Sequence, residues 1–277
     1  MTVQSVPFMS LIGMALTLIL SAGLPIALFI YCRKKLEVRI SSLIFGALIY
    51  YAAAKLLEPT INASILSNLG GGVMKNSFIY AVYVGLIATV IEEGCRYLAL
   101  KSLVKNVDES NALFFAVGFC GLEAILTAAW PQVSNILNSV LINNGMMAQT
   151  MALLQEPALS STYFTLAPLW ETSSAAFLLA GFERSLIIIM HICLSILVFY
   201  YIKTGNKQFM AVALIAHFAV VACSALLGQM GHALLSVLTT AAVTAALVVF
   251  TQRSRKEYLA AIPMSEYAVF EVDQPLE

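Results

Sequence analysis

Long apolar runs dominate the chain, and short polar segments separate them. A helix that crosses a bilayer needs about 20 predominantly apolar residues. Seven runs approach or exceed this length, so the pattern predicts an all-α polytopic membrane protein, a bundle of seven transmembrane helices. The predicted helices cover residues 8–31, 40–57, 77–103, 111–130, 184–203, 208–227 and 229–251.

The segment between the fourth and fifth predicted helices has no basic residue and no run of full spanning length. Within it, residues 133–154 carry apolar side chains on one side and asparagines on the other, which is typical of an amphipathic helix in the membrane interface. We therefore expect a membrane domain over residues 1–251, with interfacial helices at about 131–182. Residues 252–277 are polar and lack periodicity, and we expect a disordered cytoplasmic tail there.

The positions of lysine and arginine predict the orientation, because short cytoplasmic loops are enriched in them. An N-terminus outside and a C-terminus inside place eleven of the fifteen basic residues on the cytoplasmic side. Glu183 and Arg184 are then expected to mark the outer membrane boundary, with the alternative that Arg184 reaches inward to a carboxylate. The expected location is the cell (plasma or inner) membrane. The eleven residues are Arg33, Lys34, Lys35, Arg39, Lys101, Lys105, Lys203, Lys207, Arg253, Arg255 and Lys256.

Composition agrees with a surface that faces lipid. The chain is 60% hydrophobic and 11% charged, against about 25% charged residues in soluble domains. The lipid bilayer is therefore an expected partner, and the net charge of zero gives no reason to propose nucleic acid. The five cysteines show no C-x-x-C spacing, so neither a disulfide framework nor a cysteine zinc site is predicted.

Acids and histidines inside the predicted helices are the candidates for function, because each ionisable group at bilayer depth costs about 2.5–3.5 kcal/mol on insertion scales. Glu92 and Glu93 lie past the midpoint of the third helix. Glu123 lies roughly 15 Å from the cytoplasmic start of the fourth helix, at 1.5 Å per residue. His217 lies roughly 12 Å from the cytoplasmic side and His191 roughly 10 Å from the outer side. Four helices thus bring an acid or a histidine to one central slab.

The spacing within the third helix predicts different environments for its two glutamates. Glu92 and Arg96 are i,i+4 and can form an ion pair. Glu93 projects about 100° away and is then free to face a cavity, as a general base would. The alternatives are structural: an ion pair that only holds the fold, and histidines that only make hydrogen bonds between helices.

The order of these motifs resembles the YhfC family. The motifs are Glu92-Glu93-x-x-Arg96, a Gly-x-Glu helix at residues 121–123, a Phe-Glu-Arg…His element at residues 182–191, and His217. The similarity covers about residues 5–250. The resemblance implies that the chain is a member of one branch of the glutamic intramembrane proteases, the superfamily that includes the CPBP proteins and the CAAX-prenyl endopeptidases.

The resemblance implies an intramembrane endopeptidase, a hydrolase that cleaves a membrane-embedded peptide or protein substrate. Glu92 or Glu93 would activate a water, and His191 and His217 would polarise it and stabilise the oxyanion. In the prenyl endopeptidases an asparagine lies four residues after the last histidine, where this chain has Val221. A homo-oligomer is possible. The supporting residues would be Arg96, Glu123 and Arg184.

We expect this mechanism to need no metal and no other cofactor. The chain has no His-x-x-x-His pair, and its two central histidines lie on separate helices beside acids. The seven spans and the histidines also resemble the Aph subunit of gamma-secretase, a non-catalytic scaffold that lacks the paired glutamates. A transporter is a third possibility, because buried glutamates and histidines also form proton relays, but the chain shows no inverted repeat.

Overall fold

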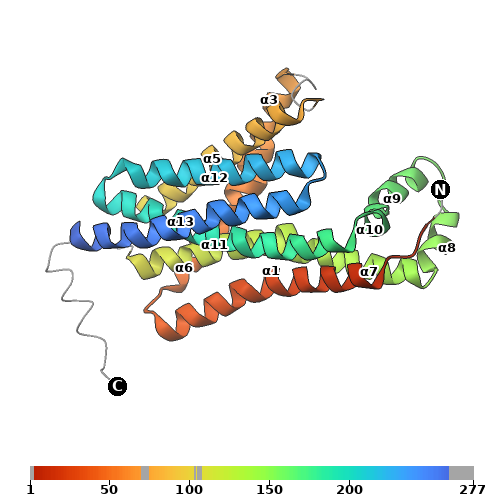
Figure 1. Ribbon diagram of the computed structural model, residues 1–277, viewed down its shortest axis with the longest axis horizontal. Coiled ribbons are helices and arrows are strands. Elements are labelled where there is room, and N and C mark those ends of the chain that lie inside the picture. The colour runs from red at the N-terminus through yellow and green to blue at the C-terminus, as the bar shows by residue number, and fades with distance from the viewer. Residues whose placement is uncertain (1–2, 70–74, 103, 105–107, 262–277) are drawn as a thin grey trace.

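The computed structural model describes residues 3–69, 75–102, 104 and 108–261. These residues form helices and no strand (Figure 1). The elements are α1 (Phe8–Lys35), α2 (Ile40–Tyr50), η1 (Tyr51–Leu57), α3 (Glu58–Leu69), α5 (Ser77–Ser102), α6 (Glu109–Ala124), η2 (Ile125–Ala129), α7 (Trp130–Asn143), α8 (Met146–Ala152), α9 (Ala158–Leu166), α10 (Pro168–Glu171), α11 (Ser174–Thr204), α12 (Lys207–Gln229) and α13 (Ala233–Ala261).

Seven helical stretches in the described part of the chain are long and apolar enough to cross a membrane. This confirms the predicted all-α bundle of seven transmembrane helices. Two of the stretches join several elements: Ile40–Ile65 comprises α2, η1 and most of α3, and Glu109–Asn143 comprises α6, η2 and α7. The orientation of the termini stays a prediction.

Two helices extend beyond their predicted boundaries. The fourth continues past residue 130 to Asn143, because Pro131 lies in the first turn of α7, directly after the π-helical segment η2. The fifth begins at Ser174 instead of residue 184, with the Ser173 hydroxyl accepting a hydrogen bond from the amide of Ala176. Apolar residues on both sides of Glu183 and Arg184 thus belong to one helix.

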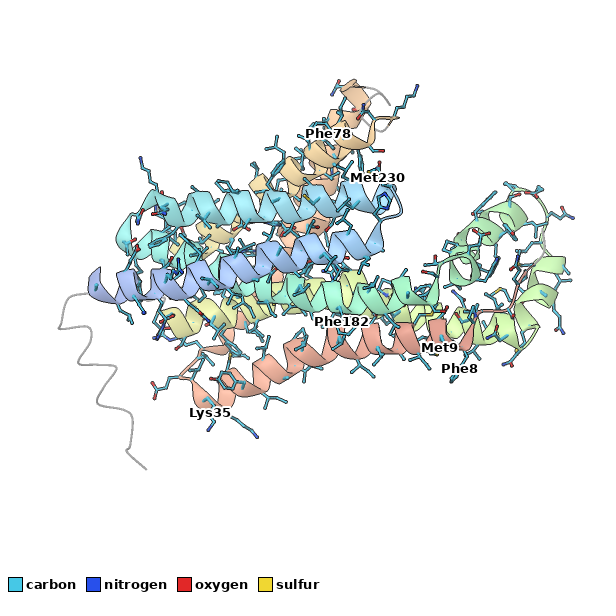
Figure 2. The ribbon with its side chains drawn as sticks, in the orientation of Figure 1. Phe8, Met9, Lys35, Phe78, Phe182 and Met230 are labelled. Carbon is cyan, nitrogen blue, oxygen red and sulfur yellow. The ribbon has the colours of Figure 1, made fainter. Side chains whose placement is uncertain are left out.

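The region expected to be interfacial is therefore divided. The predicted helix over residues 133–154 is broken at Gly145, whose φ of 75° ends α7 and starts the short α8. Helices α8, α9 and α10 gather at the end of the bundle opposite to Lys35 (Figures 1 and 2). At the other terminus, α13 continues to Ala261 and does not end near residue 251; residues 262–277 lie outside the described residues.

Helix α11 lies inside the bundle, against α1, α6, α12 and α13. Aromatic side chains fill the space around it, with Phe119 and Phe199 completely buried. Large apolar side chains such as Phe78 and Phe182 instead project outward (Figure 2), as expected of a surface that faces lipid tails.

Glycines bring the backbones of α2 and α6 together. A Cβ atom on Gly46 would collide with the carbonyl oxygen of Phe115, and one on Gly118 would collide with the carbonyl oxygen of Leu43. Small residues at a helix crossing allow this close approach in membranes. The contact fixes α6, which carries Glu123, against its neighbour.

Candidate functional site

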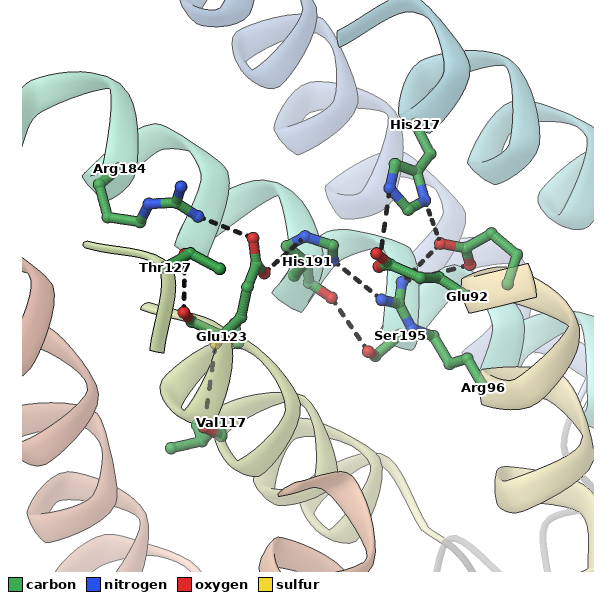
Figure 3. A network of polar contacts seen from close by, with 11 residues as sticks. Glu92, Arg96, Val117, Glu123, Thr127, Arg184, His191, Ser195 and His217 are labelled. Atoms are coloured by element: carbon green, nitrogen blue, oxygen red, sulfur yellow. Dashed lines mark hydrogen bonds and ion pairs between the residues drawn. The ribbon is translucent and has the colours of Figure 1, made fainter. Parts of the chain in front are cut away.

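Four helices bring the predicted ionisable residues into one buried network (Figure 3). Glu92, Glu93 and Arg96 come from α5, Glu123 from α6, Arg184 and His191 from α11, and His217 from α12. Ion pairs and hydrogen bonds connect all seven side chains. The structure thus brings every residue of the predicted site together, whereas the catalytic roles assigned to them stay predictions.

Glu93 is the central carboxylate on α5. It accepts hydrogen bonds from Arg96 Nη1, at 2.9 Å to Oε1 and 3.2 Å to Oε2. His217 Nδ1 lies 2.7 Å from Glu93 Oε1. The prediction that Arg96 pairs with Glu92 and leaves Glu93 free is therefore wrong. Glu93 and Glu92 lie three and four residues before Arg96, so either could share a helix face with it. In the pairing that is observed, Glu93 also accepts the hydrogen bond of His217 on α12.

Glu92, and not Glu93, is the glutamate of α5 without an arginine partner among the described residues. It is buried, and its Oε2 makes no hydrogen bond to any described residue. The same atom lies 3.8 Å from His217 Nε2. A buried acceptor without a partner is rare in proteins and calls for an explanation such as a bound ion.

The opposite end of the network is built on Glu123. Arg184 Nη1 donates to Glu123 Oε1 at 2.7 Å, and His191 Nε2 lies 2.9 Å from Glu123 Oε2. The expectation that Arg184 marks the outer boundary is wrong, and the alternative that it reaches inward to a carboxylate holds. Because α11 starts ten residues before Arg184, the guanidinium lies well inside the N-terminal end of the helix.

Arg96 joins the two ends of the network. Its Nη2 lies 2.9 Å from His191 Nδ1, while its Nη1 holds Glu93. The guanidinium also lies over the ring of Phe119, at 4.3 Å from the centroid, and this ring is 5.4 Å from that of His191. Cation–π contact stabilises a guanidinium that is removed from water. Phe119 was not predicted as a site residue, since a phenylalanine in an apolar helix gives no signal of its own.

The partners of the histidines define their tautomers. A guanidinium only donates hydrogen bonds, so His191 Nδ1 accepts from Arg96. The proton of a neutral His191 then lies on Nε2, 2.9 Å from Glu123 Oε2. In His217 the proton lies on Nδ1, because the carboxylate of Glu93 accepts there. The Nε2 lone pair of a neutral His217 then faces Glu92. Each histidine thus has one N–H beside a carboxylate, the arrangement that orients histidine ligands in metal sites.

Glu92, His191 and His217 can together hold a metal ion. Each offers one buried ligand atom, and the three atoms lie within 4.8 Å of one another. Two histidines and a carboxylate form a known ligand set of catalytic zinc sites. The unpartnered Glu92 Oε2 and the Nε2 lone pair of His217 fit this use directly. His191 fits once its Nδ1 is released from Arg96, since that lone pair accepts the guanidinium N–H.

One further acid, Glu183 on α11, points into the bundle and not to the outer boundary. Its Oε1 accepts hydrogen bonds from Ser224 at 3.1 Å, Ser236 at 2.7 Å and Thr240 at 3.3 Å. The expectation for Glu183 is therefore wrong, for the same reason as for Arg184. The hydroxyls were not predicted as partners, because serine and threonine in an apolar run show no spacing that marks them.

With its bundle of apolar helices and buried ionisable network, the chain is a multi-pass membrane protein. The model of the family described as YhfC intramembrane metalloprotease matches residues 20–248, and the chain belongs to this family. It is similar to the Uncharacterized membrane protein YhfC of Bacillus subtilis (strain 168), with 29% identity over 197 residues, which cover 70% of this chain and 76% of that protein. No solved structure matches the chain significantly.

The family description overturns the expected metal-independent, glutamate-type mechanism, because it names a metalloprotease. The argument against a metal rested on the lack of a local His-x-x-x-His pair. That motif collects ligands from one helix only, whereas here α5, α11 and α12 each supply one ligand atom. The grouping with the CPBP proteins and prenyl endopeptidases stays an expectation.

Proposed function

We propose that this protein is an intramembrane metalloprotease that hydrolyses a peptide bond of a membrane-embedded peptide or protein, and that Glu92, His191 and His217 hold its metal ion. The observation that carries the proposal is the convergence of these three buried ligand atoms from three helices. Membership of a family with this description supports the activity. A bound metal of this kind supplies Lewis acidity, which activates water and polarises a carbonyl group.

The remaining side chains of the network orient the ligands. Glu93 accepts from His217 Nδ1 and so directs the Nε2 lone pair toward Glu92. Glu123 lies 2.9 Å from His191 Nε2 and keeps the ring proton on that nitrogen, so that Nδ1 can ligate once Arg96 releases it. Arg96 and Arg184 in turn hold the carboxylates of Glu93 and Glu123. Loss of such outer partners typically lowers metal affinity or activity 10–100-fold.

The charges of the network suit a divalent cation. Three carboxylates and two guanidiniums carry one formal negative charge in excess, in a part of the membrane where an uncompensated charge is expensive. A divalent ion brings the formal charge to plus one, which favours a developing negative charge on a substrate carbonyl. The proposal also places the protein in the cell membrane, with the N-terminus outside and the C-terminus inside.

The test starts from the full chain, purified in detergent and reconstituted into liposomes with a library of transmembrane peptides. We expect about one zinc or other divalent metal ion per chain by mass spectrometry. Cleavage should stop with a chelator and return with added metal. Glu92→Gln and His217→Ala should lose both metal and cleavage.

His232→Ala is the matched control, because the third histidine of the chain is exposed in the turn between α12 and α13 and lies outside the network. It should retain metal and activity. Cleavage that persists after complete metal removal would contradict the proposal. Metal-free wild type that cleaves nothing and co-purifies with a stable partner protein would instead favour a scaffold.

A further inference from the structure

Glu183 lies outside the network around the histidines, and its carboxylate connects three helices. It belongs to α11, whereas Ser224 belongs to α12, and Ser236 and Thr240 belong to α13. All three hydroxyls donate to the same oxygen, Oε1. Ser236 Oγ also lies 3.2 Å from Ser224 Oγ. A carboxylate suits this position, because it only accepts hydrogen bonds.

Glu183 is partly buried and has no basic partner among the described residues, so hydroxyl groups compensate the loss of water at its carboxylate. Polar contacts between helices contribute about 0.6 kcal/mol each in membrane proteins, and at most about 1.7 kcal/mol. Such modest contacts do not explain why an ionisable residue occupies this depth. A role in positioning explains its presence, because the Glu183 carboxylate connects α11 to α12 at one fixed point along both helices.

Helices α11 and α12 carry His191 and His217 and contact each other at two levels. At the first level the two imidazole rings lie 5.3 Å apart. At the second level Glu183 Oε1 lies 3.1 Å from Ser224 Oγ. Eight residues separate Glu183 from His191 along α11, and seven separate His217 from Ser224 along α12. The two helices are connected by a short turn and are antiparallel. The step from His191 back to Glu183 and the step from His217 on to Ser224 therefore run in the same direction, each by roughly 11–12 Å.

We propose that Glu183 is a positioning residue, whose contacts with Ser224, Ser236 and Thr240 fix the register of α11 against α12 and thereby the spacing of His191 and His217. A second polar contact level restricts sliding and rotation of this helix pair more than the apolar packing and the histidine level alone. Metal–ligand distances in well-formed sites agree with their usual values within about 0.2 Å, so the spacing of the ligands matters. The link to catalysis rests on the proposed function, but the register itself does not.

The first measurement is the Co²⁺ affinity and the visible spectrum of the Co²⁺-loaded full chain in detergent, since the spectrum reports ligand geometry. Glu183→Leu removes the acceptor and should weaken Co²⁺ binding about 10–100-fold, as loss of a ligand-orienting partner does, with an altered spectrum. Glu183→Gln retains an oxygen acceptor without the charge and should restore both values toward wild type. An equal loss of Co²⁺ affinity in the two variants would overturn the proposal, because the charge of Glu183, and not its contacts, would then determine Co²⁺ binding.

Glu109→Leu is the matched control. Glu109 also connects three helices, α6, α11 and α13, by accepting from Tyr200 Oη at 2.8 Å and from Arg255 Nε at 2.8 Å, but these contacts do not involve α12. It should lower the unfolding temperature and leave Co²⁺ binding unchanged. If Glu109→Leu weakened Co²⁺ binding as much as Glu183→Leu, general destabilisation would explain the effect and the proposal would fall.

A second measurement needs no metal. His191→Cys/His217→Cys in a background without the five native cysteines should react rapidly with a short thiol cross-linker. Adding Glu183→Leu should slow this reaction several-fold, and adding Glu109→Leu should not. An unchanged cross-linking rate with Glu183→Leu would refute the register claim. Wild type that binds no Co²⁺ would instead refute the proposed metal site, while the cross-link still decides the claim about register.

Discussion

The two adjacent glutamates of α5 should respond in opposite ways to the same change. Glu93→Gln removes the charge that compensates the Arg96 guanidinium, which is completely buried. Glu92→Gln alters a carboxylate whose Oε2 has no hydrogen-bond partner among the described residues. The side-chain volume is conserved in both variants, so the difference between them isolates the ion pair.

The magnitude follows from the burial of the pair. Breaking a buried ion pair by removing one partner costs about 3–5 kcal/mol. At about 2 °C per kcal/mol for a chain of this size, Glu93→Gln should lower the unfolding temperature by about 6–10 °C. Glu92→Gln should remain within about 1 kcal/mol of wild type, or gain slightly, because one of two neighbouring negative charges is lost.

The assay is thermal unfolding in detergent with excess chelator, so that stabilisation by bound metal does not contribute. Metal content and peptide cleavage are measured in parallel without chelator, and both variants should lose them. Equal unfolding temperatures for the two variants would refute the assignment of Glu93 as the partner of Arg96. A strong destabilisation by Glu92→Gln alone would mean that the pairing is reversed.

Three further predictions address other parts of the bundle. Gly118→Ala should cost about 1–3 kcal/mol, because its Cβ would meet the carbonyl oxygen of Leu43. The control is Gly94→Ala, whose Cβ would meet no described residue within 4 Å; equal unfolding temperatures for the two variants would contradict the close crossing. Arg184→Gln should cost about 1–3 kcal/mol, as loss of a charged hydrogen bond does, and weaken metal binding through Glu123; unchanged metal affinity would separate Arg184 from the site. Reporter fusions at residues 36, 106, 205 and 255 should all report the cytoplasm, and an exported signal at 106 or 205 would contradict the orientation.

Much of the architecture follows from the sequence, because hydropathy and helix rise are local properties. Seven apolar runs predict the seven spans, and counting residues along them predicts that Glu123, His191 and His217 share one depth. The choice of partners is not local. Either glutamate can reach Arg96 along one helix face, and only His217, on another helix, makes Glu93 the better partner.

The metal and the inward charges were missed for a related reason. Ligand motifs describe one helix, whereas Glu92, His191 and His217 come from three. Hydropathy also cannot distinguish a charged pair at a membrane boundary from one that points into the bundle. Hydropathy therefore predicts Glu183 and Arg184 at the boundary, whereas the structure gives each of them an interior partner.

The number of residues in the π-helical segment η2 determines which way the side chains before and after it face. A π-helical turn contains one residue more than an α-helical turn, which shifts the phase of all later side chains by about 100°. Immediately before it, Glu123 faces the site, and the Thr127 hydroxyl donates to the carbonyl oxygen of Glu123 at 2.7 Å. Beyond it, Ser139 lies against Met14 of α1, with Oγ 3.8 Å from Sδ. Deleting a single residue from this segment would therefore act far from the deletion, because either Glu123 or the face of α7 that contacts α1 would turn away from its neighbours.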